Sequence, residues 1–222
     1  MQTVRIIIDA AKAYYEEILF FIVTGGILLA ATFLIIPMPF ALIGVWMIAH
    51  RAVRGLGVNW GLYWRAVKEY GLRSLQLTLV LALGYGLLAI NVWFYTTPDI
   101  SPFPAGVLAW IRPIVLVIGL VWICISFYAH AFLIELEEPK LSLILRSSLS
   151  LTFIKPVPTV ILLIITLALT VLSVAVPILL LALPGFIATL SITAVRTFVA
   201  TIREKYGIGE EKSTETDTLE VS

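Results

Sequence analysis

The sequence predicts an all-α protein: a polytopic transmembrane helical bundle of about six spans, with short cytoplasmic interfacial helices. Three observations support this fold class. The 222-residue chain is 60% hydrophobic and 13% charged, and its mean hydropathy of +1.04 is far too high for a soluble domain of this size. Several uncharged runs exceed the roughly 18 residues that indicate a spanning helix. These runs are continuously apolar rather than alternating, which favours helices over a closed barrel.

The first elements are an amphipathic helix and two apolar segments. Charged residues recur at helical spacing before residue 18, which predicts a lead-in helix to a first span over about 18–36. Pro37 and Pro39 end that span, because proline lacks a backbone N–H donor. A second apolar piece follows over about 40–53. Residues 18–49 are too few for two full crossings of about 20 residues each, so the second span is short or re-entrant.

Residues 51–73 form the basic loop that orients the chain. Five Lys and Arg residues fall here against the single acid Glu69, and short basic loops of this kind stay in the cytoplasm. From Asn59, a predicted N-cap, an aromatic face lies opposite a basic face at helical period. The sequence therefore predicts an interfacial helix over 59–73, which either anchors the protein in the headgroup layer or docks a partner. Its defining residues are Trp60, Trp64, Arg65, Lys68 and Arg73.

The later spans follow the remaining apolar runs. The third is predicted at about 74–95, and the fourth ends at about 134. A short helix is expected between Pro139 and Pro156, and the uncharged run 157–195 holds the fifth and sixth spans, divided by two prolines, Pro177 and Pro184. Residues 1–206 then form a single transmembrane domain, and the polar residues 207–222 form a disordered cytoplasmic tail.

The distribution of Lys and Arg predicts the topology. The predicted outer loops hold only Asp99 and Arg112, which places both termini in the cytoplasm and residues 96–109 outside. In a protein with five crossings and an external N-terminus, only Arg5 and Lys12 would move to the outer side, so this alternative stays open.

The sequence predicts neither an enzyme nor a cofactor site. It holds no phosphate-binding glycine loop, no HExxH helix and no paired intramembrane carboxylates. The net charge of +1 argues against a nucleic-acid partner. The single cysteine, Cys124, excludes disulfides and cysteine-based metal sites within one chain.

Polar residues near the helix ends are the candidate functional or structural sites. The histidines near predicted cytoplasmic helix ends serve either as interfacial caps or as ligands. Threonines recur every four residues along the sixth span, with a shorter stripe on the fifth; such stripes either let helices pack closely or line a polar pathway. The candidate cluster consists of His50, Arg51, His130, Glu135, Thr193, Arg196 and Thr197.

Arg196 follows the longest uncharged run of the chain. Its guanidinium can snorkel to the headgroups, or it can face the bundle and pair with an acid, for which Glu135 is the leading candidate. The neighbouring Thr193 and Thr197 favour the pair, because the hydroxyl stripe indicates that this side of the helix meets protein.

Several sequence motifs occur together along the chain. They are Ile36-Pro37 before the short apolar helix, Ala49-His50-Arg51-Ala-Val-Arg54-Gly55, Tyr63-Trp64-Arg65-Ala-Val-Lys68, Asn91-Val-Trp93-Phe94-Tyr95, and the segment from Glu137-Glu138-Pro139 to Pro156. These motifs resemble the YesL-like family of bacterial integral membrane proteins. The resemblance covers most of the chain and carries no established activity or catalytic residues. Members of the family often look like companions of carbohydrate-uptake systems.

The resemblance implies an accessory protein of the bacterial cytoplasmic membrane. Two functions are therefore expected. The first is a non-catalytic component that binds or regulates a carbohydrate transporter permease through its cytoplasmic loops. The second is a small transporter or channel, acting as a homo-oligomer, that uses the polar stripe between the fifth and sixth spans. The lipid bilayer is the surrounding partner in both cases.

Overall fold

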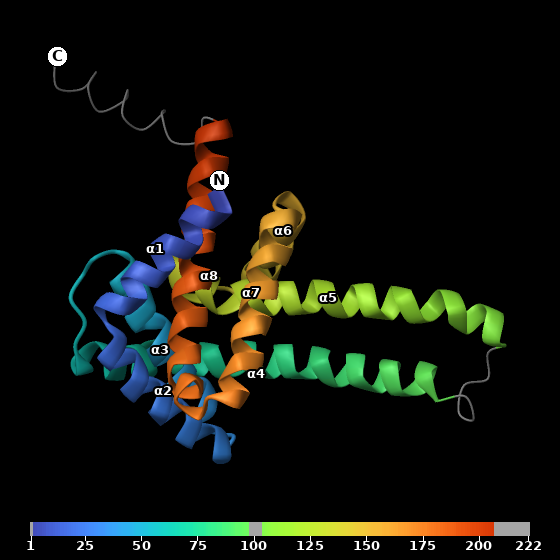
Figure 1. Cartoon of the computed structure of the whole chain (residues 1–222), viewed down its shortest axis with the longest axis horizontal. Helices are drawn as coiled ribbons and strands as arrows, with labels where there is room; N and C mark the ends of the chain where they lie inside the picture. Colours follow the sequence, from blue (N-terminus) through green and yellow to red (C-terminus); the bar gives the residue numbers. More distant parts are fainter. Residues whose placement is uncertain (1, 98–103, 207–222) are drawn as a thin grey trace.

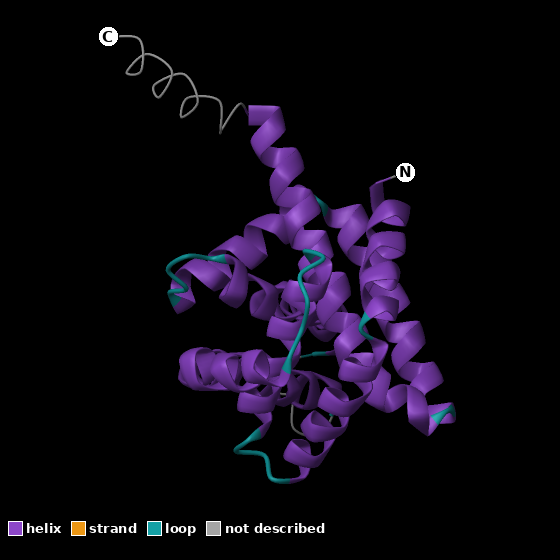
Figure 2. Ribbon diagram, turned by 90° about the vertical axis from the view of Figure 1, so that its left-hand side faces the viewer, coloured by secondary structure: helices purple, strands orange, loops and turns teal. Residues whose placement is uncertain are grey.

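The computed structural model describes residues 2–97 and 104–206, and this part of the chain contains helices and no strand (Figures 1 and 2). The predicted all-α class is confirmed. The tail over 207–222, which the sequence predicted to be disordered, lies outside the described residues. Residues 98–103 of the predicted outer connection also lie outside them. The helices are α1 (Gln2–Glu16), α2 (Ile18–Phe33), α3 (Met38–Val53), α4 (Trp60–Thr96), α5 (Ala105–Glu135), α6 (Leu141–Ile154), α7 (Pro156–Ala175) and α8 (Pro177–Tyr206).

Four of the described helices are long and apolar enough to cross a membrane, namely α4, α5, α7 and α8. Helices α1 and α2 make a fifth span only if they are taken together, across a bend of 86°. Helix α3 is apolar but has 16 residues, about 24 Å at 1.5 Å per residue, which is shorter than a hydrocarbon core of about 30 Å. A multi-pass helical architecture is supported, and the predicted count of about six spans is not confirmed.

The break between α2 and α3 follows from the two prolines. Helix α2 ends at Phe33, and the chain turns through Ile35, which has a φ of 58°. A β-branched residue is strained in this left-handed region. Pro37 disfavours a helical conformation for the residue before it, so the helix stops before the prolines. Pro39 then lies in the first turn of α3, where its missing N–H has no intrahelical partner to lose.

Helix α4 joins two segments that the sequence predicted as separate elements, the interfacial helix over 59–73 and the third span over about 74–95. Asn59 is its N-cap, as predicted, and its side-chain oxygen accepts a hydrogen bond of 2.9 Å from the Leu62 N–H. The helix then continues unbroken from Trp60 to Thr96. The predicted interfacial helix over 59–73 is therefore the beginning of a long helix rather than a separate element. No proline interrupts the stretch, and a single glycine does not end a helix.

The sequence predicted that Pro177 and Pro184 divide the last two long helices, and the structure places the boundary at the first of these prolines. Helix α7 ends at Ala175, and α8 begins at Pro177, the first helical position, where proline is tolerated. Pro184, which the sequence placed at the boundary, lies inside α8.

Helix α3 lies at the centre of the bundle, in contact with α1, α2, α4, α5 and α8. Its Ile43, Val45 and Ile48 are fully buried. Helices α2 and α8 approach closely, because Gly25 lies against the backbone of Leu181. The C-terminal ends of α3 and α5 lie against α8.

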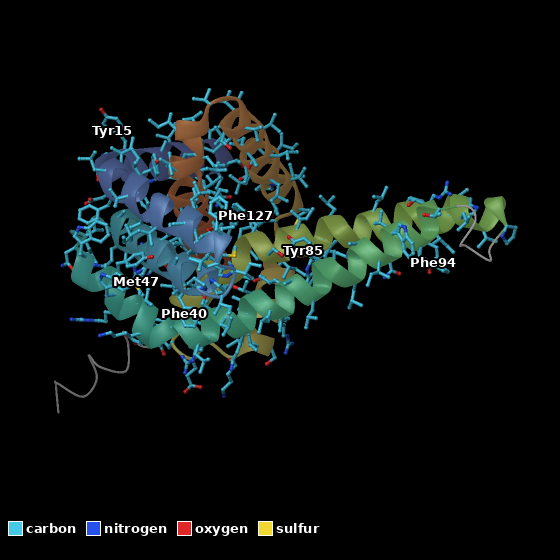
Figure 3. All side chains as sticks on the ribbon, turned by 90° about the horizontal axis from the view of Figure 1, so that it is seen from below. Tyr15, Phe40, Met47, Tyr85, Phe94 and Phe127 are labelled. Atoms are coloured by element: carbon cyan, nitrogen blue, oxygen red, sulfur yellow. The ribbon has the colours of Figure 1, made fainter. Side chains whose placement is uncertain are left out.

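Helices α4 and α5 form a long hairpin that runs crosswise to α8 and reaches beyond the other helices (Figures 1 and 3). The outer half of the hairpin exposes large apolar side chains, including Leu83, Leu87, Trp93, Leu116 and Val117. Exposed apolar surface of this extent suits contact with lipid rather than with water.

Candidate functional site

Glu135, the last residue of α5, lies among basic residues from two other helices. Its Oε2 accepts a hydrogen bond of 3.2 Å from the guanidinium of Arg54, the residue that caps the C-terminus of α3. Its Oε1 lies 3.3 Å from His50 Nε2 and 4.0 Å from Arg196 Nε. One carboxylate thus links the ends of α3 and α5 to α8. We call this group, together with Arg51, the Glu135 cluster.

The predicted pairing of Arg196 with Glu135 is present, at the outer limit of an ion pair. The Arg196 side chain is 38% exposed and the Glu135 side chain 15% exposed. Arg54 makes the shorter contact with Glu135. Sequence reasoning missed Arg54, although its position three residues after Arg51 places the two on neighbouring parts of one helix face.

The Glu135 cluster carries more positive than negative charge. It holds three guanidinium groups, those of Arg51, Arg54 and Arg196, and one carboxylate, and the guanidiniums of Arg54 and Arg196 approach that carboxylate. His50 lies in α3, outside the span-length helices. Burial, followed by the charges of Arg54, Arg196 and Arg51, lowers the pKa of His50 to about 4. This shift favours the neutral imidazole near pH 7, whereas the Glu135 carboxylate, 3.3 Å from the ring, favours the charged form.

Several buried polar atoms in the Glu135 cluster have no hydrogen-bond partner within the described protein. They are Glu135 Oε1, both ring nitrogens of His50, and Arg51 Nε. The contact of 3.3 Å between His50 and Glu135 is thus a close approach without hydrogen-bond geometry. An unpaired buried polar atom costs about 1–3 kcal/mol, and such atoms in a native structure point to strain or function. The cluster is the candidate functional site.

A polar cavity of about 960 Å³ adjoins the cluster and lies between α1, α3 and α8. Thr193, Arg196 and Thr197 line it, so the structure brings these three predicted residues together. Sequence reasoning did not include α1 in the site. The signal that points to α1 is the row of charges along one helix face. The charged residues that line the cavity are Arg5, Asp9, Lys12, Glu16, Arg196 and Glu204.

Three threonines of the stripe on α8 donate hydrogen bonds to carbonyl groups of their own helix. Thr189 donates to Gly185 O at 2.9 Å, and Thr193 donates to Thr189 O at 2.7 Å. Thr201 Oγ1 donates to Thr197 O at 2.8 Å. The cavity reaches Thr193, whereas Thr189 is fully buried. Of the two alternatives for the stripe, the polar pathway was expected between the fifth and sixth spans, but the hollow beside the stripe lies between α8, α1 and α3.

His130 lies apart from the Glu135 cluster. Its side chain is buried, with its ring centroid 5.4 Å from that of Trp46. Its Nε2 lies 3.5 Å from the hydroxyl oxygen of Thr78, at the limit of a hydrogen bond. The structure therefore does not join the two histidines in one site.

The aromatic and basic residues of the first part of α4 lie at the surface. Trp60 packs against Phe20 with ring centroids 5.4 Å apart and is 41% exposed. Trp64 is 53% exposed. Arg65, Lys68 and Arg73 are exposed beside them.

Comparison with family models, curated proteins and solved structures gives no match. The resemblance to the YesL-like family therefore stays an expectation from the sequence motifs.

Proposed function

We propose that this chain is a non-catalytic membrane component that binds and regulates a partner protein through its cytoplasmic surface. The resemblance in sequence supports a carbohydrate transporter permease as that partner. The bundle holds the binding surface in place, and the surface itself lies on the first turns of α4.

The main support for this proposal is an exposed aromatic and basic surface on the first turns of α4. A shallow hollow of about 400 Å³ is lined by Gly61, Trp64, Arg65, Lys68 and Glu69. Tryptophan and arginine are the residues that most often dominate the binding energy of protein interfaces.

The opposite face of the same turns is fixed in the core. Tyr63 is 1% exposed and Ala66 is 2% exposed. The Tyr63 ring fills the space beside Gly44 of α3, so the helix cannot rotate without losing this contact. A helix held in this way presents Trp64 with little loss of conformational entropy on binding, which favours a docking role.

Photo-crosslinking in native membranes tests the proposal. A photoreactive amino acid in place of Lys68 should form crosslinks to transporter subunits, which mass spectrometry of the purified adducts would identify. Replacing Trp64 with alanine should lower the yield at least about tenfold, equivalent to the 1.4 kcal/mol or more expected of an interface hot spot. The matched control is Trp93→Ala, because Trp93 is similarly exposed, at 58%, on the outer half of the hairpin. Crosslinks to lipid alone would reject the docking role and leave an interfacial anchor.

The polar cavity favours a second candidate function, a small transporter or channel. Its volume of about 960 Å³ would admit a small polar solute, and its lining holds equal numbers of acidic and basic side chains. A continuous path would have to pass Thr189, which is fully buried, and Gly185, which lies against the Phe21 ring. Solute flux into liposomes that contain the purified protein alone would support this second function over the first.

A further inference from the structure

A second hollow, of about 420 Å³, lies where the α4–α5 hairpin leaves the bundle. Helices α3, α4, α5, α7 and α8 all line it. Tyr85 and Phe127, two of its lining residues, lie near the base of the hairpin in Figure 3. The volume falls within the range of about 300–1,000 Å³ that is usual for small-molecule sites. We call this hollow the hairpin groove.

One end of the hairpin groove holds buried polar groups. Trp46 is 7% exposed, and its indole N–H has no hydrogen-bond partner within the described protein. His130 is also 7% exposed, and within the described residues its one hydrogen-bond contact is the 3.5 Å approach to Thr78. A buried donor without an acceptor is costly, so this end of the groove suits a ligand that brings a hydrogen-bond acceptor.

The groove is apolar away from this end. Along α3 it extends from Trp46 to Met38, eight residues or about 12 Å of helix. Along α5 it extends from His130 to Ile123, seven residues or about 10 Å. A narrow apolar groove with polar groups at one end is complementary to a hydrocarbon chain that carries an acceptor at one end.

The polar end of the groove points toward the Glu135 cluster. Helices α3 and α5 are in register, because Trp46 contacts His130 and, further along both helices, His50 contacts Glu135. The cluster lies four or five residues, about 6–8 Å, beyond the polar end. Its excess of guanidinium groups over carboxylates is complementary to a phosphate. The order phosphate, ester and hydrocarbon in a phospholipid matches the order cluster, Trp46 and apolar groove.

We propose that the hairpin groove binds one acyl chain of a membrane phospholipid. The ester carbonyl of this chain accepts a hydrogen bond from the Trp46 indole N–H. The phosphate lies beside Arg54 and Arg196, whose side chains are 40% and 38% exposed. This site is distinct from the docking surface on α4 and does not depend on a protein partner.

Photo-labelling of the full chain in lipid nanodiscs tests the site. The probe is a phospholipid that carries a diazirine in the middle of one acyl chain. Labelled peptides should concentrate on residues 38–46 and 123–130 rather than spread evenly along the exposed hairpin. Trp46→Phe, which keeps the ring and removes the donor, should lower this labelling about 2- to 10-fold. Trp110→Phe is the control for the same chemical change away from the groove, because Trp110 is 77% exposed on the outer part of the hairpin.

A second variant separates loss of the site from loss of the fold. Ala82 lines the groove and is exposed within it, so Ala82→Phe should fill the groove, abolish the localised labelling and leave the elution volume of the protein unchanged. Native mass spectrometry should show one retained phospholipid in the original protein and none in Ala82→Phe. Uniform labelling along the hairpin, or labelling that neither variant changes, would overturn the proposal. A retained free fatty acid, or a second protein chain crosslinked through the groove, would overturn it as well.

Discussion

At the scale of single residues, the contacts of Glu135 show how one carboxylate links the ends of α3 and α5 to the side of α8. Arg54 donates a direct hydrogen bond at 3.2 Å, whereas Arg196 approaches only to 4.0 Å. Both arginines are partly exposed, so solvent screens each pair. The stability of the cluster therefore depends mainly on the short contact with Arg54.

Replacing Arg54 with leucine is expected to lower the free energy of unfolding by about 1–2 kcal/mol, because it removes a charge-assisted hydrogen bond. Replacing Arg196 with leucine should cost less than about 1 kcal/mol. Thermal unfolding of the two variants in the same detergent measures the difference. Each loss should shrink in a Glu135→Gln background, since the shared partner is then neutral. A larger loss for Arg196→Leu than for Arg54→Leu would contradict this ranking.

His50 is expected to make the fold sensitive to acid. Burial and the neighbouring guanidiniums lower the pKa of His50 to about 4 in the folded protein, against an ordinary value of about 6.5 in the unfolded chain. The folded state binds this proton less readily than the unfolded chain does. The stability that neutral His50 contributes to the fold is therefore fully present above pH 6.5 and is lost as the pH falls from 6.5 towards 4. The loss should reach roughly 2–3 kcal/mol. Unfolding curves at pH 7 and pH 4.5 should differ less for His50→Gln than for the original protein; an unchanged difference would show that other groups carry the acid sensitivity.

At the scale of the helices, the α2–α8 contact depends on glycine. A Cβ on Gly25 would meet the backbone of Leu181, whereas the nearest atom to a Cβ on Gly26 is Leu181 Cδ2 at 3.9 Å. Backbone cannot move aside as a side chain can, so the two adjacent glycines should respond differently to the same change.

Gly25→Ala is expected to destabilise the protein by about 1–3 kcal/mol through overpacking. Gly26→Ala, the matched control on the same helix, should be neutral or stabilising by up to about 1 kcal/mol, because alanine favours the helix over glycine. Chemical denaturation in detergent would compare the two. Equal effects of both changes would mean that α2 and α8 are not held as closely as described.

Local sequence rules predict those features of the elements that depend on neighbouring residues. The proline break after α2 and the Asn59 cap are both found, because each is determined within a few residues. The continuity of α4 was missed, since a change from an amphipathic to an apolar pattern at Arg73 does not require a break in the helix. The Arg54 contact escapes such rules because it joins residues 81 positions apart. The cavity beside α1 escapes them because three separate helices, α1, α3 and α8, line it.

At the scale of the whole molecule, the first and last described helices lie side by side. Gln2 Nε2 donates a hydrogen bond of 2.8 Å to Thr201 Oγ1. The start of α1 and the end of α8 therefore share one side of the bundle. The excess of Lys and Arg over residues 51–73, around the connection between α3 and α4, predicts that this region faces the cytoplasm. We expect the two helix ends to face the cytoplasm as well.

Cysteine labelling tests this orientation. The native Cys124 is buried and can be replaced by serine to give a silent background. Of three single variants, Arg5→Cys, Thr96→Cys and Glu204→Cys, only Thr96→Cys should react with an impermeant maleimide in intact cells. All three should react after the membrane is opened. Labelling of Arg5→Cys in intact cells would favour five crossings with an external N-terminus, and labelling of Glu204→Cys would reverse the whole arrangement.

The contact between α1 and α8 also has a consequence for biosynthesis. The two residues of the Gln2–Thr201 hydrogen bond are 199 positions apart, and a ribosome that adds about 5–20 residues per second needs roughly 10–40 s to cover that distance. For this time α1 has no α8 to pack against. Its exposed apolar residues, Val4, Ile8 and Tyr15, allow it to rest on the membrane surface during the wait. The bundle is therefore completed only when the last helix has been made, and a nascent chain stalled before α8 should leave α1 open to protease.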